Sequence, residues 1–389
     1  MVKEKKCVPV STGSSKVLTK GASKLLNNVK RKGHSMVLSV AEVAGKCVFV
    51  GIDVHKSTYS VCTVVEGRIC KRVRMPANPH DLVKWLKKGF SGSEIKSAYE
   101  AGFAGFNLHR VLDAAGISNI VVNPASIPIA ANDRVKTDKR DAEKIAGELS
   151  RGGLKGIYVP SLKAELARLL PRTRAQLVKE KSRLGNQIKA KLFEFGLIAV
   201  DDERSVSLKL LNEYEALDLP TDLLFSVKIL ADLYRSVHAQ ILKVEQQMQT
   251  QAAENPKIEA IYRSVPGVGP VSSRILAAEL GDMSRFPTER DLYSYTGLTP
   301  REYSSGTKER RGGITRQGNT RVRHCLVEVA WRAIKQDPAL KEKYEALKMR
   351  CGGKRAIVGI ARGLVGRIRA CLRDEKAYAL GVGLRVLAT

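Results

Sequence analysis

The pattern of hydrophobic and polar positions divides the chain into four stretches. The first has no sustained apolar period, and the second alternates short apolar runs with turns. The third and fourth have apolar residues at helical spacing. We therefore expect a basic, disordered arm, an α/β domain, a helical coiled-coil region and a mainly helical C-terminal domain. Their expected boundaries are 1–45, 46–160, 161–255 and 256–389.

The second stretch is rich in β-branched residues between turn signals, which predicts strands separated by amphipathic helices. The expected order is three strands, a helix, a strand, a helix, a strand and a closing helix. This is the order of the ribonuclease H-like, or RuvC-like, fold, in which the first and fourth strands are neighbours. The predicted strands are 47–52, 58–65, 68–74, 96–100 and 118–123, and the predicted helices are 80–86, 105–115 and 138–149.

The third stretch contains a strict seam of apolar residues at alternating steps of three and four. Such a seam over three heptads predicts a left-handed coiled coil. Its partner is either the helix expected over 177–195 in the same chain or the equivalent helix of another protomer, and the pattern does not distinguish them. The seam consists of Val227, Leu230, Tyr234, Val237, Ile241, Val244 and Met248.

The charge of the chain is strongly positive, with 67 Lys and Arg against 39 Asp and Glu and a formal net charge of +28. Such an excess indicates a polyanionic partner, most simply nucleic acid. No apolar run is long enough for a membrane span, so no membrane partner is expected. The seven cysteines include no C-x-x-C pair, which argues against a structural zinc site or a disulfide framework. We expect a cytoplasmic, nucleoid-associated protein.

Four carboxylates fall at positions that could form one site. Asp53 follows an apolar strand, Glu100 ends another, and Asp138 and Asp141 lie three apart at the start of a helix. In a ribonuclease H-like sheet these acids would converge and hold two Mg²⁺ or Mn²⁺ ions about 4 Å apart. Taken singly, each acid is more simply an exposed surface charge. His55, two residues from Asp53, is more simply structural, although it lies near enough to touch a scissile phosphate.

A glycine-containing turn, SVPGVGP at 264–270, precedes a helical stretch. It resembles a helix-hairpin-helix, in which backbone N–H groups of a glycine loop contact a DNA phosphate. Gly267 and Gly269 are therefore candidate nucleic-acid contacts, independent of base sequence. A plain connector between helices is the alternative.

The stretch 297–323 combines a serine pair, Ser304 and Ser305, with many cations. A serine hydroxyl among cations can attack a phosphodiester, because the cations stabilise the charge of the transition state. Residue chemistry alone favours the simpler reading of a basic loop that touches phosphate without covalent chemistry. The candidate nucleic-acid contacts are Arg301, Lys308, Arg310, Arg311, Arg316, Arg321 and Arg323.

Taken together, these segments resemble the DEDD insertion-sequence transposases, a group of bridge-RNA-guided recombinases. The resemblance runs from about residue 47 to about residue 340, in the order of the family. It rests on VGIDVHKST, YEAG at 99–102, NPASIP with KTDKRDAEKIA, SVPGVGP, and GLTPREYSSGTKERRGGITRQGN.

The resemblance implies a RuvC-like domain, a coiled-coil connection and a C-terminal transposase domain with a catalytic serine. Asp53, Glu100, Asp138 and Asp141 match the metal ligands, and Ser305, directly before a glycine, matches the nucleophile. It further implies cleavage through a phosphoserine link, a structured guide RNA that pairs with element-end and target DNA, and a homo-oligomer, either a dimer or a tetramer. The alternatives are a junction-resolving nuclease that uses water and a non-enzymatic nucleic-acid-binding protein.

Overall fold

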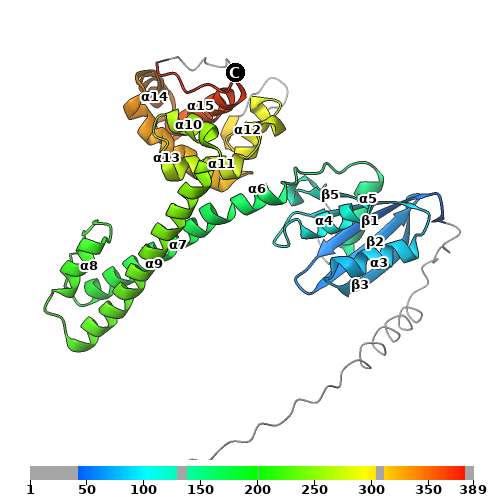
Figure 1. The fold of residues 1–389 in the computed structure, drawn as a ribbon, viewed down its shortest axis with the longest axis horizontal. Coiled ribbons are helices and arrows are strands. Elements are labelled where there is room, and N and C mark those ends of the chain that lie inside the picture. Colours follow the sequence, from blue (N-terminus) through cyan, green and yellow to red (C-terminus); the bar gives the residue numbers. More distant parts are fainter. Residues whose placement is uncertain (1–42, 129–137, 200, 304–310, 382–389) are drawn as a thin grey trace, which may run out of the picture. The chain divides into compact units, whose positions relative to one another are not determined.

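Runs rich in β-branched residues build a five-stranded sheet in the first of two structural units, Met1–Val159 and Pro160–Thr389. The computed structural model describes residues 43–128, 138–199, 201–303 and 311–381 (Figure 1). The expected arm, 1–45, lies almost entirely outside the described residues. The strands are β1 Cys47–Val54, β2 Thr58–Val65, β3 Arg68–Pro76, β4 Glu94–Glu100 and β5 Ser118–Val122.

The strands lie in the order β3-β2-β1-β4-β5. The first three pair antiparallel through short turns, whereas β4 and β5 extend the sheet parallel to β1. The first and fourth strands are therefore neighbours, as the sequence predicts. Parallel neighbours end at the same edge of a sheet, so β1 and β4 present their last residues side by side.

Helices cover both faces of this sheet. Two helices, α3 (Pro79–Gly89) and α4 (Asn107–Ala114), pack on the face that carries Val48, Val50 and Ile52. Helix α5, Asp138–Ser150, packs on the opposite face, where Ala142 and Ala146 contact β2 and Ile145 contacts β4. The sheet is thus buried between two helical layers, and its core is formed by the β-branched residues that predicted it.

The region in which the sequence predicts a coiled coil contains two long helices that pack against each other. Helix α7, Leu169–Glu194, packs along α9, Thr221–Ala253, as Figure 1 shows. Within the seam, four side chains are buried, namely Val227, Tyr234, Ile241 and Met248. The three between them, Leu230, Val237 and Val244, are half-buried. The coil therefore closes within the chain, which is one of the two expected pairings; pairing with another protomer stays a prediction. The short helices of this region are α6 Leu162–Ala167 and α8 Leu208–Glu215.

The rest of the second unit is a helical bundle with one hairpin. Its longest helix, α15, is buried along the face that carries Ile357, Ile360, Leu364 and Ile368, around which the other helices pack. This bundle and the two long helices belong to one structural unit. The expected domain boundary at residue 255 therefore stays a prediction. The other elements are α10 Pro256–Ser264, α11 Pro270–Leu280, α12 Glu289–Thr296, β6 Pro300–Glu302, β7 Arg311–Ile314, α13 Thr320–Gln336 and α14 Pro338–Cys351.

None of the helices within the described ranges combines the length and the apolar character that a membrane crossing requires.

Candidate active site and nucleic-acid surface

The end of the first sheet at which β1 and β4 finish, here called the sheet edge, brings two of the predicted acids together. The parallel register pairs Ile52 of β1 with Tyr99 of β4, so the next residues, Asp53 and Glu100, lie side by side. The side chain of Asp53 is 21% exposed, and Glu100 is exposed. Two acids that lie 47 positions apart in the sequence thus share one edge of the sheet.

The same face of the sheet carries α5. A Cβ atom on Gly51 would lie 2.1 Å from the carbonyl oxygen of Ala142, and Ala98, the β4 partner of Gly51, packs with Ile145. Side chains two residues apart in a strand share a face. Asp53 and Glu100, each two residues further along, therefore face the side of the sheet on which α5 lies.

Helix α5 carries the other two predicted acids in its first turn. Ile145 of this helix packs in one cluster with Ala98 of β4 and Val122 of β5, so the helix lies on the face of the sheet that carries Asp53 and Glu100. Asp141 is half-buried. Asp138 is the first residue of the helix, and its side chain lies outside the described residues.

His55 contacts the first acid directly. Its Nε2 atom lies 3.0 Å from Oδ2 of Asp53, and the pair is partly buried. The contact orients the carboxylate of Asp53 at the end of β1. The sequence favours a structural role for His55, and this contact is compatible with that expectation.

The donor chemistry of this edge fits a hard divalent cation. Carboxylate oxygens are the ligands that Mg²⁺ and Mn²⁺ take, and Asp53 and Glu100 share one face and one edge. Among the residues whose side chains the structure describes, no group of three or more His, Cys, Asp or Glu has metal-holding geometry. The side chain of Asp138, the fourth expected ligand, is not among them.

The predicted glycine turn joins α10 and α11 and borders a cavity of about 340 Å³. Gly267 has a φ of 78°, and a Cβ there would lie 2.7 Å from the carbonyl oxygen of Val329, so only glycine fits. Its N–H donates to Oε1 of Gln336 at 2.8 Å. Arg263 and Arg332 also line this cavity, which suits it to an anion.

Gly269 is the N-cap of α11 and makes no side-chain capping bond. The first N–H groups of the helix therefore lack a capping side chain beside the same cavity. The glycines thus lie where the sequence expects them, between two helices, and the two arginines are a feature that the turn motif by itself does not predict.

The described basic residues of 297–323 surround the short hairpin of β6 and β7. Arg301, Arg316 and Arg321 are exposed, and Arg316 has a left-handed φ of 58°. Arg311 opens β7, but its side chain is not described. Ser304, Ser305, Lys308 and Arg310 lie outside the described residues.

Arg323 differs from these residues because its guanidinium binds the protein itself. It is half-buried and donates to the carbonyl oxygen of Thr296 at 2.9 Å. Burial, and next the positive charge of Arg316, lowers the pKa of Arg323. Its described role is to join α13 to the end of α12.

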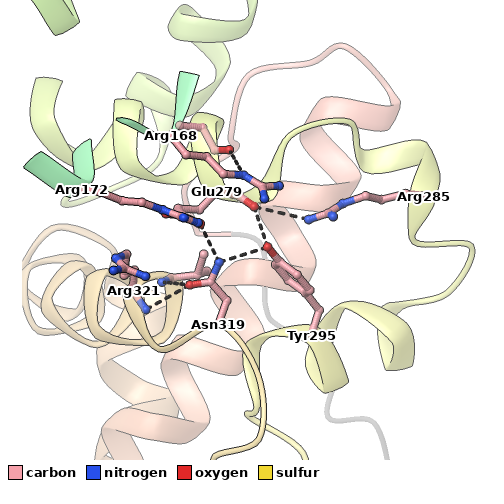
Figure 2. A network of polar contacts seen from close by, with 9 residues as sticks. Arg168, Arg172, Glu279, Arg285, Tyr295, Asn319 and Arg321 are labelled. Carbon is pink, nitrogen blue, oxygen red and sulfur yellow. Dashed lines mark hydrogen bonds and ion pairs between the residues drawn. The ribbon is translucent and has the colours of Figure 1, made fainter. Parts of the chain in front are cut away.

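A buried acid that the sequence did not single out organises the base of the hairpin. The side chain of Glu279, near the end of α11, has no solvent exposure. It accepts two hydrogen bonds from Arg172 of α7, at 2.8 and 3.0 Å, and one from Nδ2 of Asn319 at 2.8 Å. Figure 2 shows Arg172 and Asn319 converging on this carboxylate from different elements.

The residues around Glu279 form a continuous polar cluster. Asn319 also donates to the hydroxyl of Tyr295, and that hydroxyl donates to the backbone carbonyl of Glu279 at 2.8 Å (Figure 2). Oδ1 of Asn319 caps α13 by accepting from the N–H groups of Arg321 and Val322. Both ends of the hairpin segment, at Tyr295 and Asn319, are thus fixed through one acid.

Burial by itself raises the pKa of Glu279. The hydrogen bonds from Arg172 and Asn319 outweigh that effect, so the pKa lies below its usual range. The acid is therefore a paired, charged structural group. In the sequence it appears only as one acid in an apolar helical run, SSRILAAEL, and no local signal reveals its partner 107 residues earlier.

Two family models match the chain. One, described as a DEDD-type transposase, matches residues 50–196 and contains the acids of the sheet edge. The other, described as the transposase IS116/IS110/IS902 family, matches residues 259–345 and contains the glycine turn, the hairpin and Glu279 with Tyr295 and Asn319. Arg172, the remaining partner of Glu279, lies in the first match, which runs from the first unit into the start of the second.

Individual relatives agree with these matches. A putative transposase of Sinorhizobium fredii is 31% identical over 293 residues, covering 73% of this chain and 71% of the relative. A probable family 20 transposase of Pseudomonas aeruginosa is 29% identical, covering 72% and 82%. The transposase for insertion sequence element IS1111A of Coxiella burnetii is 27% identical, covering 85% and 91%. With its acids, its glycine turn and its hairpin in the matched segments, the chain belongs to the IS116/IS110/IS902 family of insertion-element transposases and is a DNA transposase.

Proposed function

We propose that this transposase cuts and rejoins DNA through a phosphoserine link, at a site organised by the acids of the sheet edge and guided by a structured RNA. The observation that carries the proposal is the register that places Asp53 beside Glu100, on the face where α5 begins with Asp138 and Asp141. The strand order supports a ribonuclease H-like, or RuvC-like, assignment for the first unit.

Asp53, Glu100, Asp138 and Asp141 would hold two Mg²⁺ ions, or Mn²⁺ in their place. When bound, such ions supply positive charge that stabilises the oxygens of a phosphoryl displacement. The chain's own contribution is to fix the acids. The sheet register holds Asp53 and Glu100, the contact of His55 orients Asp53, and the close packing of α5 on Gly51 holds Asp141.

Ser305 would be the nucleophile. Its hydroxyl oxygen forms a bond to the scissile phosphorus while the bond from that phosphorus to the 3′ oxygen breaks. The products are a 5′-phosphoserine link and a free 3′-hydroxyl, which gains the proton that the serine lost. Because the phosphodiester energy is conserved in the link, a second 3′-hydroxyl can reverse the step and join a new strand.

The basic elements would hold the nucleic-acid backbones. The glycine turn, with Gly267 and Gly269, lies beside Arg263 and Arg332 and suits a phosphate. Arg301, Arg316 and Arg321 are exposed around the hairpin and suit DNA or guide RNA. We assign Lys308, Arg310 and Arg311 the same role from their charge, and Arg323 a supporting role. Strand exchange on two duplex ends requires several active sites, hence a dimer or tetramer.

Covalent trapping tests this proposal. The full chain, expressed with the non-coding DNA that flanks its gene so that a guide RNA is supplied, is mixed with element-end DNA and Mg²⁺ and then denatured. We expect a protein–DNA adduct that is lost on chelation of the metal, in Ser305→Ala and in Asp141→Asn.

Ser304→Ala is the matched control, since it removes the neighbouring hydroxyl, and it should retain the adduct. Free nicked DNA without an adduct, formed equally by Ser305→Ala, would replace the serine mechanism with hydrolysis by water. Binding without metal-dependent cleavage would leave a non-catalytic role for the sheet edge.

A further inference from the structure

The row of residues that contains Asp53 continues across the sheet to a cation. Asp53 pairs with Ser60 of β2, and Ser60 pairs with Arg74 of β3. Directly opposite residues in a sheet point to the same face, so Arg74 lies on the side of the acids. The row therefore reads Arg74, Ser60, Asp53 and Glu100 from the outer strand inward.

The preceding row of the sheet lies on the same face, the one that α5 covers. Arg72 pairs with Cys62, whose neighbours in the packing are Ala142 and Ala146 of α5. Arg72 also forms an ion pair with Glu143 of the same helix. Arg72 is therefore engaged by α5, whereas Arg74 lies one step further along, level with the acids.

The side chain of Arg74 is exposed, and few protein groups lie within its reach. Its described contact is a long hydrogen bond, 3.4 Å from Nη2 to the hydroxyl of Thr58. Among the side chains that the structure describes, no carboxylate forms an ion pair with it. Its positive charge is thus available to a ligand at the end of the sheet that carries the acids.

A simpler explanation is that β3 is an edge strand, and edge strands carry charges that prevent pairing with other chains. Arg68, on the same strand, meets that need equally well. Its partner, Val65, belongs to the core under α3 and α4, so Arg68 lies on the opposite face from the acids. The two exposed arginines thus differ in the face on which they lie and in their place along β3, because Arg68 is its first residue and Arg74 lies near its end.

We propose that Arg74 binds a backbone phosphate of the DNA strand next to the scissile phosphate and so positions that strand on the acids. The inference rests on the proposed function of the sheet edge. Two strand spacings, about 10 Å, separate the backbones of Arg74 and Asp53, and a long arginine side chain covers part of that distance. A guanidinium can bind phosphate oxygens in a bidentate manner.

The DNA strand is favoured over the guide RNA because the row that holds Arg74 is the row that holds the acids. A phosphate bound at Asp53 and Glu100 would be the scissile phosphate. The next phosphate of the same DNA strand would then lie within reach of the Arg74 side chain.

The test combines protein variants with neutral phosphates in the DNA. Element-end duplexes carry one methylphosphonate at a time around the cleavage position, and strand cleavage by the full chain with its guide RNA and Mg²⁺ is measured. We expect Arg74→Ala to lower kcat/KM roughly tenfold, the size of one lost charged contact. One methylphosphonate next to the cut should slow the wild type similarly and slow Arg74→Ala no further.

Arg68→Ala is the matched control, because it removes the same charge from the other face and should cleave like the wild type. If the methylphosphonate slows Arg74→Ala as much as it slows the wild type, Arg74 does not bind that phosphate. If Arg74→Ala loses affinity only for the guide RNA, the partner is the RNA and the inference is wrong.

These outcomes separate the inference from the proposed function. A wild type that shows no Mg²⁺-dependent cleavage contradicts the proposed function, and the inference with it. A wild type that cleaves, together with an Arg74→Ala variant that cleaves equally well, overturns only the inference. Because Arg74 is exposed, an unchanged melting temperature in Arg74→Ala will show that the variant is folded.

Discussion

Two regions of this protein place an acid at the end of an apolar run and use it in opposite ways. Asp53 follows VFVGI in a strand, and Glu279 follows ILAA in a helix. Asp53 lies at the edge of a sheet beside Glu100, with part of its side chain exposed. Glu279 is inaccessible to solvent, and its oxygens are bound by Arg172 and Asn319.

The difference shows how burial and partners decide what an acid can do. A buried carboxylate that is fully hydrogen-bonded fixes the elements that hold its donors, and its lone pairs are not available to a ligand. A partly exposed acid beside another acid contributes little to stability but can take a cation. Glu279 is therefore a structural acid, whereas the acids of the sheet edge are placed as the proposed chemistry requires.

The largest expected effect is on the stability of the second unit. Glu279→Ala should lower its unfolding free energy by about 3 kcal/mol, because it leaves Arg172 and Asn319 without their partner. The chain has two tryptophans, Trp85 in the first unit and Trp331 in the second. Thermal unfolding followed by fluorescence in a Trp85→Phe background therefore reports the second unit alone.

Glu180→Ala is the matched control on α7. Glu180 forms an exposed ion pair with Arg183, and its loss should leave the melting temperature of the second unit nearly unchanged, because solvent screens exposed pairs. Asp53→Ala, followed through Trp85, should be similarly mild while it abolishes cleavage. A large loss of stability in Asp53→Ala and a small one in Glu279→Ala would reverse our assignment of the two acids.

A smaller loss of stability is expected from a substitution at the contact between α5 and the sheet. Gly51→Ala would place a methyl group within 2.4 Å of the backbone of both Ala142 and Ala146, so the helix must shift. Overpacking of this kind costs about 1–3 kcal/mol. We expect a lower melting temperature through Trp85 and a loss of cleavage larger than the stability change explains, because Asp141 moves with the helix.

Gly89→Ala, at the end of α3, controls for the loss of a glycine. A Cβ there meets only the side-chain nitrogen of Lys71, at 3.9 Å. Its stability and cleavage should match those of the wild type. Full cleavage activity in Gly51→Ala would show that the position of α5 is not needed for the chemistry.

The smallest expected effect is the change in stability of the second unit at low pH. The pKa of Glu279 is lower in the folded protein than in the unfolded chain, where it is about 4.3. Its stabilising contribution is therefore present above pH 4.3 and lost as the pH falls through the folded pKa. Melting of the second unit at a series of pH values below 5 should fall less steeply in Glu279→Gln than in the wild type. Parallel curves would show that Glu279 does not titrate in this way.

Much of the fold was predictable because it depends on local pattern. Runs rich in β-branched residues between turn signals predict the strands, and helical spacing predicts α5 and the long helices, to within a few residues at their ends. The seam of α9 predicted a coiled coil, but the choice of α7 as partner required the packing of Leu184, Ile188 and Leu192 against it.

The candidate site was only partly predictable, because contacts between distant residues leave no local signal. The sequence predicted that Asp53, Glu100 and Asp141 lie at the ends of a strand, a strand and a helix, and the structure places them there. Glu279 was not singled out, since its partners Arg172 and Asn319 lie 107 and 40 positions away. The pairing of Arg74 with Ser60 likewise depends on strand register.

The sequence by itself determined the order of the elements, the positive charge that indicates nucleic acid, and the acids at the ends of strands and helix. It did so because period, turn residues and net charge are local or additive properties. Only the tertiary structure decided which acids lie side by side at the end of the sheet, which acid is buried with its partners, and which cation shares the row of Asp53. Those are properties of register and packing, which exist only when residues far apart in the chain come together.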